Sequence, residues 1–93
     1  MEHVVQLSKV AKKQLTLLPF YIQKKIAEWR NDVERLGLQV VRKIPGYHDE
    51  PLKGNRTGER SVRLNRSYRA IYRVVENEIV AIILIQEVHK HDY

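Results

Sequence analysis

The last third of the sequence contains three segments typical of β-strands, which two short turns separate. Residues 60–65 form the first segment, residues 68–75 the second and residues 78–88 the third. Alternation with a period of two is typical of β-strands, and turns this short join antiparallel neighbours. The third segment is apolar on both faces, which is typical of a central or doubly covered strand. The sequence therefore predicts a three-stranded meander against which the rest of the chain must pack.

The segment before the meander predicts one strand and two helices. Residues 2–7 alternate as a short strand does, and Ser8 is a suitable N-cap for a first helix, which Pro19 ends. Residues 20–36 repeat apolar side chains at helical spacing with charged side chains between them, and Gly37 is a typical helix-ending residue. We expect the two helices to form an antiparallel pair.

Three shorter features leave more than one interpretation open. Trp29 lies in the middle of the apolar stripe and could stack on a base, although burial in a core is the commonest use of such a side chain. Residues 38–44 fit a third short helix or extended chain, and residues 45–51 form a proline-bounded loop. The glycines of residues 54–58 either shape a hairpin turn or cradle a phosphate, but no Lys-Ser/Thr pair follows them, which excludes a P-loop.

This order of elements predicts an α+β fold. An N-terminal strand and two antiparallel helices would pack on one face of an antiparallel sheet of about four strands. A chain of 93 residues leaves room for one domain, residues 1–93, with a modest core. The opposite face of the sheet would be open.

Composition excludes several classes of site. Cysteine is absent, so the chain can form no disulfide, thiolate nucleophile or cysteine-based zinc site. The N-terminus lacks the basic and apolar regions of a signal peptide, and the longest apolar run, residues 79–85, is far below the ~20 residues that a membrane helix needs. We therefore expect a soluble, cytoplasmic protein.

The positive charge of the chain is concentrated in residues 53–73. This stretch carries a net charge of +6, which equals that of the whole chain, so the remaining residues are neutral overall. Such a focused field attracts polyanions, above all nucleic acid. Its basic residues are Lys53, Arg56, Arg60, Arg63, Arg66, Arg69 and Arg73.

Two arginines and one acid are the strongest candidates for a site. Arg63 and Arg69 belong to predicted strands that a three-residue turn joins, so they can lie near each other on the open face. Paired guanidinium groups bind phosphate in a bidentate manner, although exposed strand arginines can also serve only to keep a sheet edge soluble. Glu50 precedes the basic stretch and is either a carboxylate base or an exposed loop residue without a role.

The C-terminal tail holds further titratable groups. His89 and His91 would share one face of a continued strand, and with Asp92 they could in principle chelate a metal. A structural or catalytic site needs three or four ligands, so we expect no metal. Tyr93 is a terminal residue that the last strand would bring beside the arginines.

Several of these segments together resemble one known family. EPLKG at residues 50–54, SVRL at 61–64, YRAIY at 68–72 and a tail with histidine and tyrosine are similar to the RelE/YoeB branch of the RelE/ParE toxin superfamily. The resemblance implies a RelE-like, microbial-RNase-like fold. It also implies a toxin of a bacterial type II toxin–antitoxin system, which enters the ribosomal A site and cuts mRNA without a metal.

The resemblance also implies roles for individual residues. Glu50 would be the general base that takes the proton of the ribose 2′-OH, and Arg69 would stabilise the charge of the phosphorane. His91 would be the general acid, and Tyr93 would stack on or position a base. Lys53 and Arg63 would hold neighbouring phosphates. Apart from the resemblance, Arg56, Arg60 and Arg66 are expected to follow the RNA backbone, or to serve only as surface charge, so the residues expected to bind RNA are Lys53, Arg56, Arg60, Arg63 and Arg66.

The tail departs from the family pattern. YoeB-type tails end in adjacent histidine and tyrosine, whereas this chain ends in His91-Asp92-Tyr93. Either His91 acts from the opposite strand face, or Asp92 takes part of the role and His89 is the acid.

Other functions and partners stay open at this level. A ParE-like, non-enzymatic inhibitor of DNA gyrase and a plain basic RNA-binding module are the alternatives to an endoribonuclease. A free toxin would kill its host, so we expect a cognate antitoxin, a partly disordered chain that folds on binding. The other expected partners are mRNA and the A site of the 30S subunit, with no membrane, metal or other cofactor.

Overall fold

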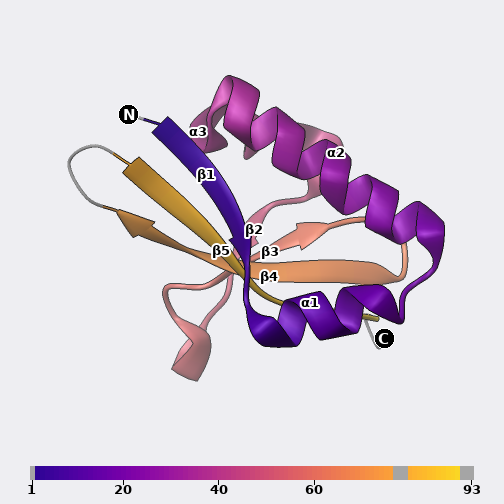
Figure 1. Ribbon diagram of the computed structural model, residues 1–93. Coiled ribbons are helices and arrows are strands. Elements are labelled where there is room, and N and C mark those ends of the chain that lie inside the picture. Colours follow the sequence, from indigo (N-terminus) through magenta and orange to yellow (C-terminus); the bar gives the residue numbers. More distant parts are fainter. Residues whose placement is uncertain (1, 77–79, 91–93) are drawn as a thin grey trace.

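A computed structural model of the protein describes residues 2–76 and 80–90. It confirms the α+β class, because the helices pack against a single sheet (Figure 1). The strands are β1 (Glu2–Leu7), β2 (Glu50–Pro51), β3 (Arg60–Arg63), β4 (Tyr68–Glu76) and β5 (Val80–Lys90). The helices are α1 (Lys9–Thr16), α2 (Phe20–Leu36) and α3 (Leu38–Val41), with the 3-10 turns η1 (Pro45–Tyr47) and η2 (Gly54–Arg56).

The sheet extends the predicted meander at both edges. Its strand order is β1-β5-β4-β3-β2, so β3, β4 and β5 form the expected antiparallel meander. The N-terminal strand does not pack on a face of the sheet: β1 pairs with β5 in parallel, because α1 and α2 provide the crossover that a parallel neighbour requires. At the other edge, β2 pairs antiparallel with β3. The two-residue β2 is too short for its sequence to show alternation.

The helix boundaries follow from local sequence. Ser8 caps α1, since the Ala11 N–H donates to its Oγ at 3.0 Å. α2 begins and ends where the periodicity predicts, and Gly37 ends it with φ 87°, which glycine adopts without strain. The helical alternative was right for the start of residues 38–44, where α3 forms.

Side chains of the two longer helices satisfy backbone groups of the outer strands. The Val5 N–H of β1 donates to Glu34 Oε2 of α2 at 3.0 Å. β1 ends opposite Ile85, and farther along β5 the Val88 N–H donates to Gln14 Oε1 of α1 at 2.7 Å. The two helices run in roughly opposite directions along the sheet (Figure 1). Their side chains therefore satisfy backbone N–H groups of β1 and β5 that would otherwise lack a partner at this edge of the sheet.

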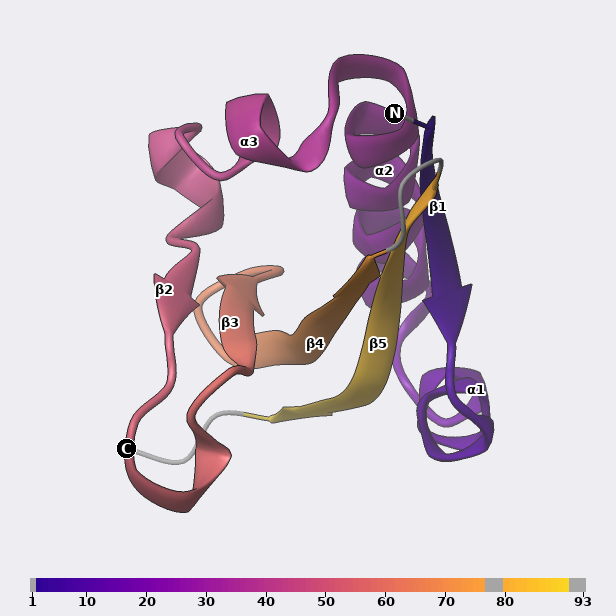
Figure 2. The ribbon, with the colours of Figure 1, turned by 90° about the vertical axis from the view of Figure 1, so that its left-hand side faces the viewer.

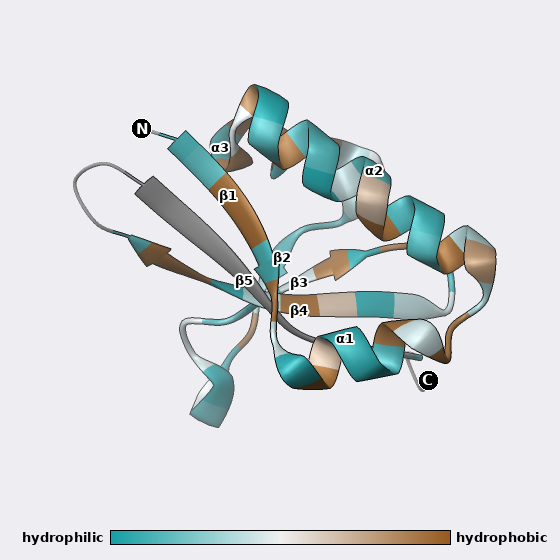
Figure 3. Ribbon diagram, viewed as in Figure 1, coloured by the Kyte–Doolittle hydropathy of each residue, from teal (hydrophilic) through white to brown (hydrophobic). Residues whose placement is uncertain are grey.

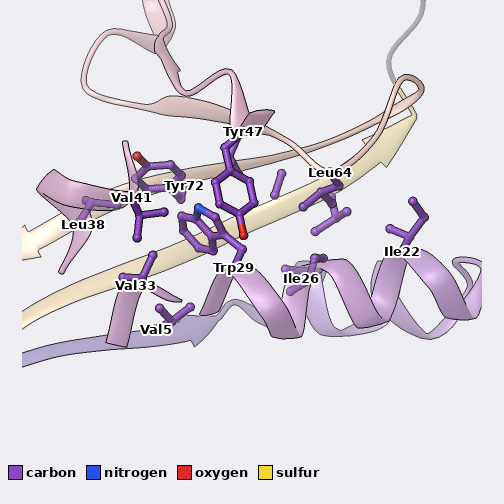
Figure 4. Packing of buried hydrophobic residues seen from close by; sticks show 14 residues of the cluster. Val5, Ile22, Ile26, Trp29, Val33, Leu38, Val41, Tyr47, Leu64 and Tyr72 are labelled. Carbon is purple, nitrogen blue, oxygen red and sulfur yellow. The ribbon is translucent and has the colours of Figure 1, made fainter. Parts of the chain in front are cut away.

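The core lies between α2 and the bent sheet. Trp29 is 1% exposed, and its ring centroid lies 5.2 Å from that of Tyr72 on β4 (Figure 4), which confirms the core interpretation. Figure 2 shows β1 and α2 on one side of the bend and β2 and α3 on the other, so the hydrophobic side chains meet in between. Along the α2 ribbon of Figure 3 hydrophilic and hydrophobic residues recur, as its stripe predicts.

Within the described ranges 2–76 and 80–90, no helix is both long enough and apolar enough to span a bilayer.

The Ile26 side chain tests how much the α2 stripe contributes to stability. Ile26 is 3% exposed in the core, so Ile26→Ala should lower the free energy of unfolding by about 2–5 kcal/mol through lost burial and a residual cavity. Val10→Ala on α1, where the side chain is 57% exposed, should change it by no more than about 0.5 kcal/mol. Urea unfolding followed by the fluorescence of the single tryptophan measures both. Equal effects would contradict this account of the core.

Candidate active site

The register of the sheet places the two candidate arginines on the same face. Arg63 of β3 lies directly opposite Arg69 of β4, as the three-residue turn predicts. Residues opposite each other in an antiparallel pair project from the same face, with Cβ atoms about 4.5–5.5 Å apart. Ser61 precedes Arg63 by two residues and Glu50 lies opposite Ser61, so all four belong to this face. Val62 and Ala70 alternate with them and are buried in the core.

Arg69 is buried, and the expectation of a fully open face is wrong at this position. Its residue surface is only 8% exposed. The Nε–H donates to the Oγ of Ser61, itself 2% exposed, and Nη2 donates to the backbone oxygen of His48 at 3.1 Å. Nη2 also lies 3.4 Å from Oε1 of Glu50. The loop before β2 and the neighbouring strand therefore cover the guanidinium and hold it in one orientation.

Glu50 forms the exposed rim of this arrangement. Its side chain is 62% exposed, whereas that of Arg69 is 10% exposed, so the ion pair joins a solvent-exposed carboxylate to a buried cation. Arg63 is half-buried and pairs with no side chain in the part of the chain that the structure describes. An exposed carboxylate, a fixed guanidinium and a second cation thus lie together on one face.

The loop that carries Glu50 is anchored from the opposite face. His48 has left-handed backbone torsions, φ 43° and ψ 49°, which turn the chain into β2. The Asp49 side chain is 1% exposed and accepts hydrogen bonds from Arg60 Nε at 2.6 Å and from the Tyr72 hydroxyl. Burial, together with the hydrogen bond to Asp49, raises the pKa of Tyr72, so the phenol stays a donor at neutral pH.

Two of the predicted RNA-binding residues are held in ion pairs away from Arg69. Arg60 lies on the core side of β3 and pairs with Asp49. Arg56 of η2 makes two hydrogen bonds to Glu59, at 2.9 and 3.0 Å, and these contacts hold the pKa of the Glu59 carboxyl below its usual range. The structure therefore does not bring Arg56 and Arg60 to the carboxylate–guanidinium pair.

The remaining candidates lie on loops or outside the described residues. Lys53 is exposed just before η2, and Arg66 is exposed in the turn between β3 and β4. His91 and Tyr93 lie outside the described residues, as does Asp92. The backbone of β5 places His89 opposite Arg69, so the last strand reaches this site.

Sequence reasoning missed two residues that hold the site together. Ser61 was recognised only as a strand residue, yet its alternation with Arg63 already placed a small polar group on the arginine face. Asp49 was assigned to a loop, because a two-residue strand gives no periodic signal. Two consecutive acids, Asp49 and Glu50, would have indicated carboxylates on opposite faces once the strand was known.

The described residues contain no group of three or more histidine or acidic side chains that could bind a metal ion.

Comparison with solved structures places this fold in a known group. No protein-family model and no curated protein matches the chain. The YoeB–YefM toxin–antitoxin complex from Staphylococcus aureus is 26% identical with a TM-score of 0.70, over 100% of both chains. The RelBE2 toxin–antitoxin complex from Mycobacterium tuberculosis is 25% identical with a TM-score of 0.68, over 98% of this chain and 100% of that chain.

The fold is RelE/YoeB-like. The DinJ–YafQ toxin–antitoxin complex from E. coli adds a TM-score of 0.75 at 15% identity, over 98% of this chain and 94% of that chain, which shows the fold alone. The similarity covers the RelE/YoeB-like chain from end to end, including β2, β3 and β4, which carry Glu50, Arg63 and Arg69.

Two substitutions in this RelE/YoeB-like site should affect stability differently. Ser61→Ala removes the acceptor of a buried guanidinium N–H, so it should lower the free energy of unfolding by about 1–3 kcal/mol. Glu50→Gln removes the exposed partner of an ion pair, so it should lower the free energy of unfolding by at most about 1 kcal/mol. Urea denaturation of both variants tests this difference. A larger loss for Glu50→Gln than for Ser61→Ala would show that the anchoring is assigned to the wrong partner.

Proposed function

We propose that this chain is the toxin of a bacterial type II toxin–antitoxin system and that it acts as a metal-independent, ribosome-dependent endoribonuclease on mRNA. The observation that carries the proposal is the exposed Glu50 carboxylate, 3.4 Å from the buried Arg69 guanidinium, on the sheet face that also holds Arg63. The similar YoeB, RelBE2 and YafQ structures are toxins or toxin–antitoxin complexes, which supports the toxin role.

The reaction is attack of a ribose 2′-OH on the adjacent phosphorus. Glu50 takes the 2′-OH proton, the O2′–P bond forms, and the phosphorane collapses with loss of the 5′-oxygen. The products are a 2′,3′-cyclic phosphate and a 5′-hydroxyl end. Such a cleavage needs a base, an acid and a fixed cation, and it needs no metal when all three come from the protein.

Arg69 supplies the fixed cation. A guanidinium has five N–H donors, and the contacts with Ser61, His48 and Glu50 engage Nε and Nη2. Among the described residues Nη1 has no partner, so it is the group that can donate to a non-bridging phosphate oxygen. Because the guanidinium is already oriented, little reorganisation is required as negative charge develops in the transition state.

Other residues complete the proposed site. Arg63 and Lys53 bind phosphates next to the scissile one, and Arg66 adds to the attraction for the RNA backbone. His91 donates the proton to the leaving oxygen, with His89 or Asp92 as the alternative acids, and Tyr93 stacks on or positions a base. This assignment follows the family resemblance of the tail.

The same comparisons support one of the proposed partners, an antitoxin. YoeB–YefM, RelBE2 and DinJ–YafQ are complexes of toxin and antitoxin, so we expect a cognate antitoxin to bind this chain. The substrate is mRNA in the A site of the 30S subunit, which places the activity in the cytoplasm.

Arg69→Ala tests the proposal. In a reconstituted translation reaction the wild-type protein should cleave mRNA and stop synthesis, and Arg69→Ala should lower the cleavage rate by at least about 10²-fold, because the transition state loses its cation. Arg69→Lys keeps a charge without the fork of donors and should fall between them. Primer extension on the mRNA gives the rates, and circular dichroism checks that each variant is folded.

The control is Arg35→Ala, because the Arg35 side chain on α2 is 62% exposed. This variant should cleave mRNA at the wild-type rate. A folded Arg69→Ala variant that still cuts mRNA at the wild-type rate would contradict the catalytic role. A gyrase supercoiling assay run in parallel distinguishes the ParE-like alternative, for which supercoiling would stop while mRNA stays intact.

A further inference from the structure

Residues 48–50, which lead into β2, contact the sheet on both of its faces. The backbone oxygen of His48 and the carboxylate of Glu50 both lie against Nη2 of Arg69, at 3.1 and 3.4 Å. The residue between them, Asp49, projects to the core side and binds Arg60 and Tyr72. The contacts with Arg69 therefore depend on where Asp49 is held.

The backbone alone gives this segment little support. β2 has two residues at the edge of the sheet, and one of them is Pro51, which has no N–H to donate. His48 is the only non-glycine residue with positive φ in the described part of the chain, a conformation that persists only when its surroundings enforce it. An anchor other than the strand ladder is needed.

Asp49 has the surroundings of such an anchor. Its side chain is 1% exposed, and the Tyr72 residue that donates to it is fully buried, with its ring 5.2 Å from that of Trp29. Arg60, whose side chain is 22% exposed, neutralises the Asp49 carboxylate through Nε at 2.6 Å. The loop is thus fixed to the buried Trp29–Tyr72 pair of the core through one carboxylate.

We propose that Asp49 is a positioning residue for catalysis: its buried carboxylate fixes residues 48–50 so that Glu50 and the His48 carbonyl hold the Arg69 guanidinium. Asp49 itself contacts neither the RNA nor the reacting atoms. The inference rests on the proposed endoribonuclease function for its kinetic consequences, whereas its structural consequence at Arg69 does not.

The expected effect of Asp49→Asn follows from this geometry. The amide has one acceptor oxygen in place of two and presents an NH₂ group to the donors of Arg60 and Tyr72, so residues 48–50 shift. A displacement of the reacting groups of about 1 Å can cost on the order of 10²-fold in rate. The RNA-binding residues outside this loop are unchanged, so kcat should fall by about that factor while KM stays close to the wild-type value.

Tyr72→Phe is a milder change that keeps the core packed and removes one hydrogen bond. It should lower kcat by about 10-fold, in the same direction as Asp49→Asn. Glu34→Gln is the matched control, since Glu34 also accepts a hydrogen bond and pairs with an arginine, but on α2 beside β1 at the far edge of the sheet. It should leave both kcat and KM unchanged.

The experiment measures kcat and KM for mRNA cleavage on programmed ribosomes and, separately, the Arg69 Nε–H resonance of ¹⁵N-labelled protein, assigned with Arg69→Lys. In the wild type and in Glu34→Gln this proton should exchange slowly. In Asp49→Asn and Tyr72→Phe it should shift and exchange faster, although the backbone spectrum stays that of a folded protein.

Wild-type kcat and an unchanged Arg69 signal in folded Asp49→Asn would overturn the proposal, as would an equal loss of kcat in Glu34→Gln. If Asp49→Asn does not fold, Tyr72→Phe decides by the same two measurements. If the wild type cuts no mRNA, the proposed function fails, and the Arg69 signal still decides whether Asp49 positions the guanidinium.

Discussion

A buried guanidinium cannot lose its proton, so the surrounding chain must satisfy its donors. Arg69 is 8% exposed, and a serine hydroxyl, a backbone carbonyl and one carboxylate oxygen from two different segments meet this requirement at Nε and Nη2. The requirement ties β4 to β3 and to the loop before β2. It also explains why an edge strand of only two residues is retained at this position.

The core of the fold connects to the loop that holds the Arg69 guanidinium. α2 packs Trp29 against Tyr72, and the hydroxyl of Tyr72 donates to Asp49, so the core and the loop before β2 are connected by consecutive contacts. Alternation along β3 and β4 places Val62 and Ala70 on the core side and Ser61, Arg63 and Arg69 on the other. Stability and the orientation of Arg69 therefore depend on the same strands, although on opposite faces.

The sequence predicted those features that have a local period. The stripe of residues 20–36 gave α2 with its observed ends, and the short turn after residue 64 predicted that Arg63 and Arg69 lie side by side. The burial of Arg69 and the direction of Asp49 depend on contacts between distant segments. The parallel pairing of β1 likewise depends on the crossover, and a strand of two residues has no period to read.

The chemical ends of the RNA fragments test the central claim most directly. Fragments of an mRNA cut in a reconstituted translation reaction would be analysed for their termini by mass spectrometry. Attack by the 2′-OH, with Glu50 as base beside a fixed Arg69, predicts 2′,3′-cyclic phosphate and 5′-hydroxyl ends. Fragments with 5′-phosphate and 3′-hydroxyl ends, or arrested synthesis with intact mRNA, would contradict it.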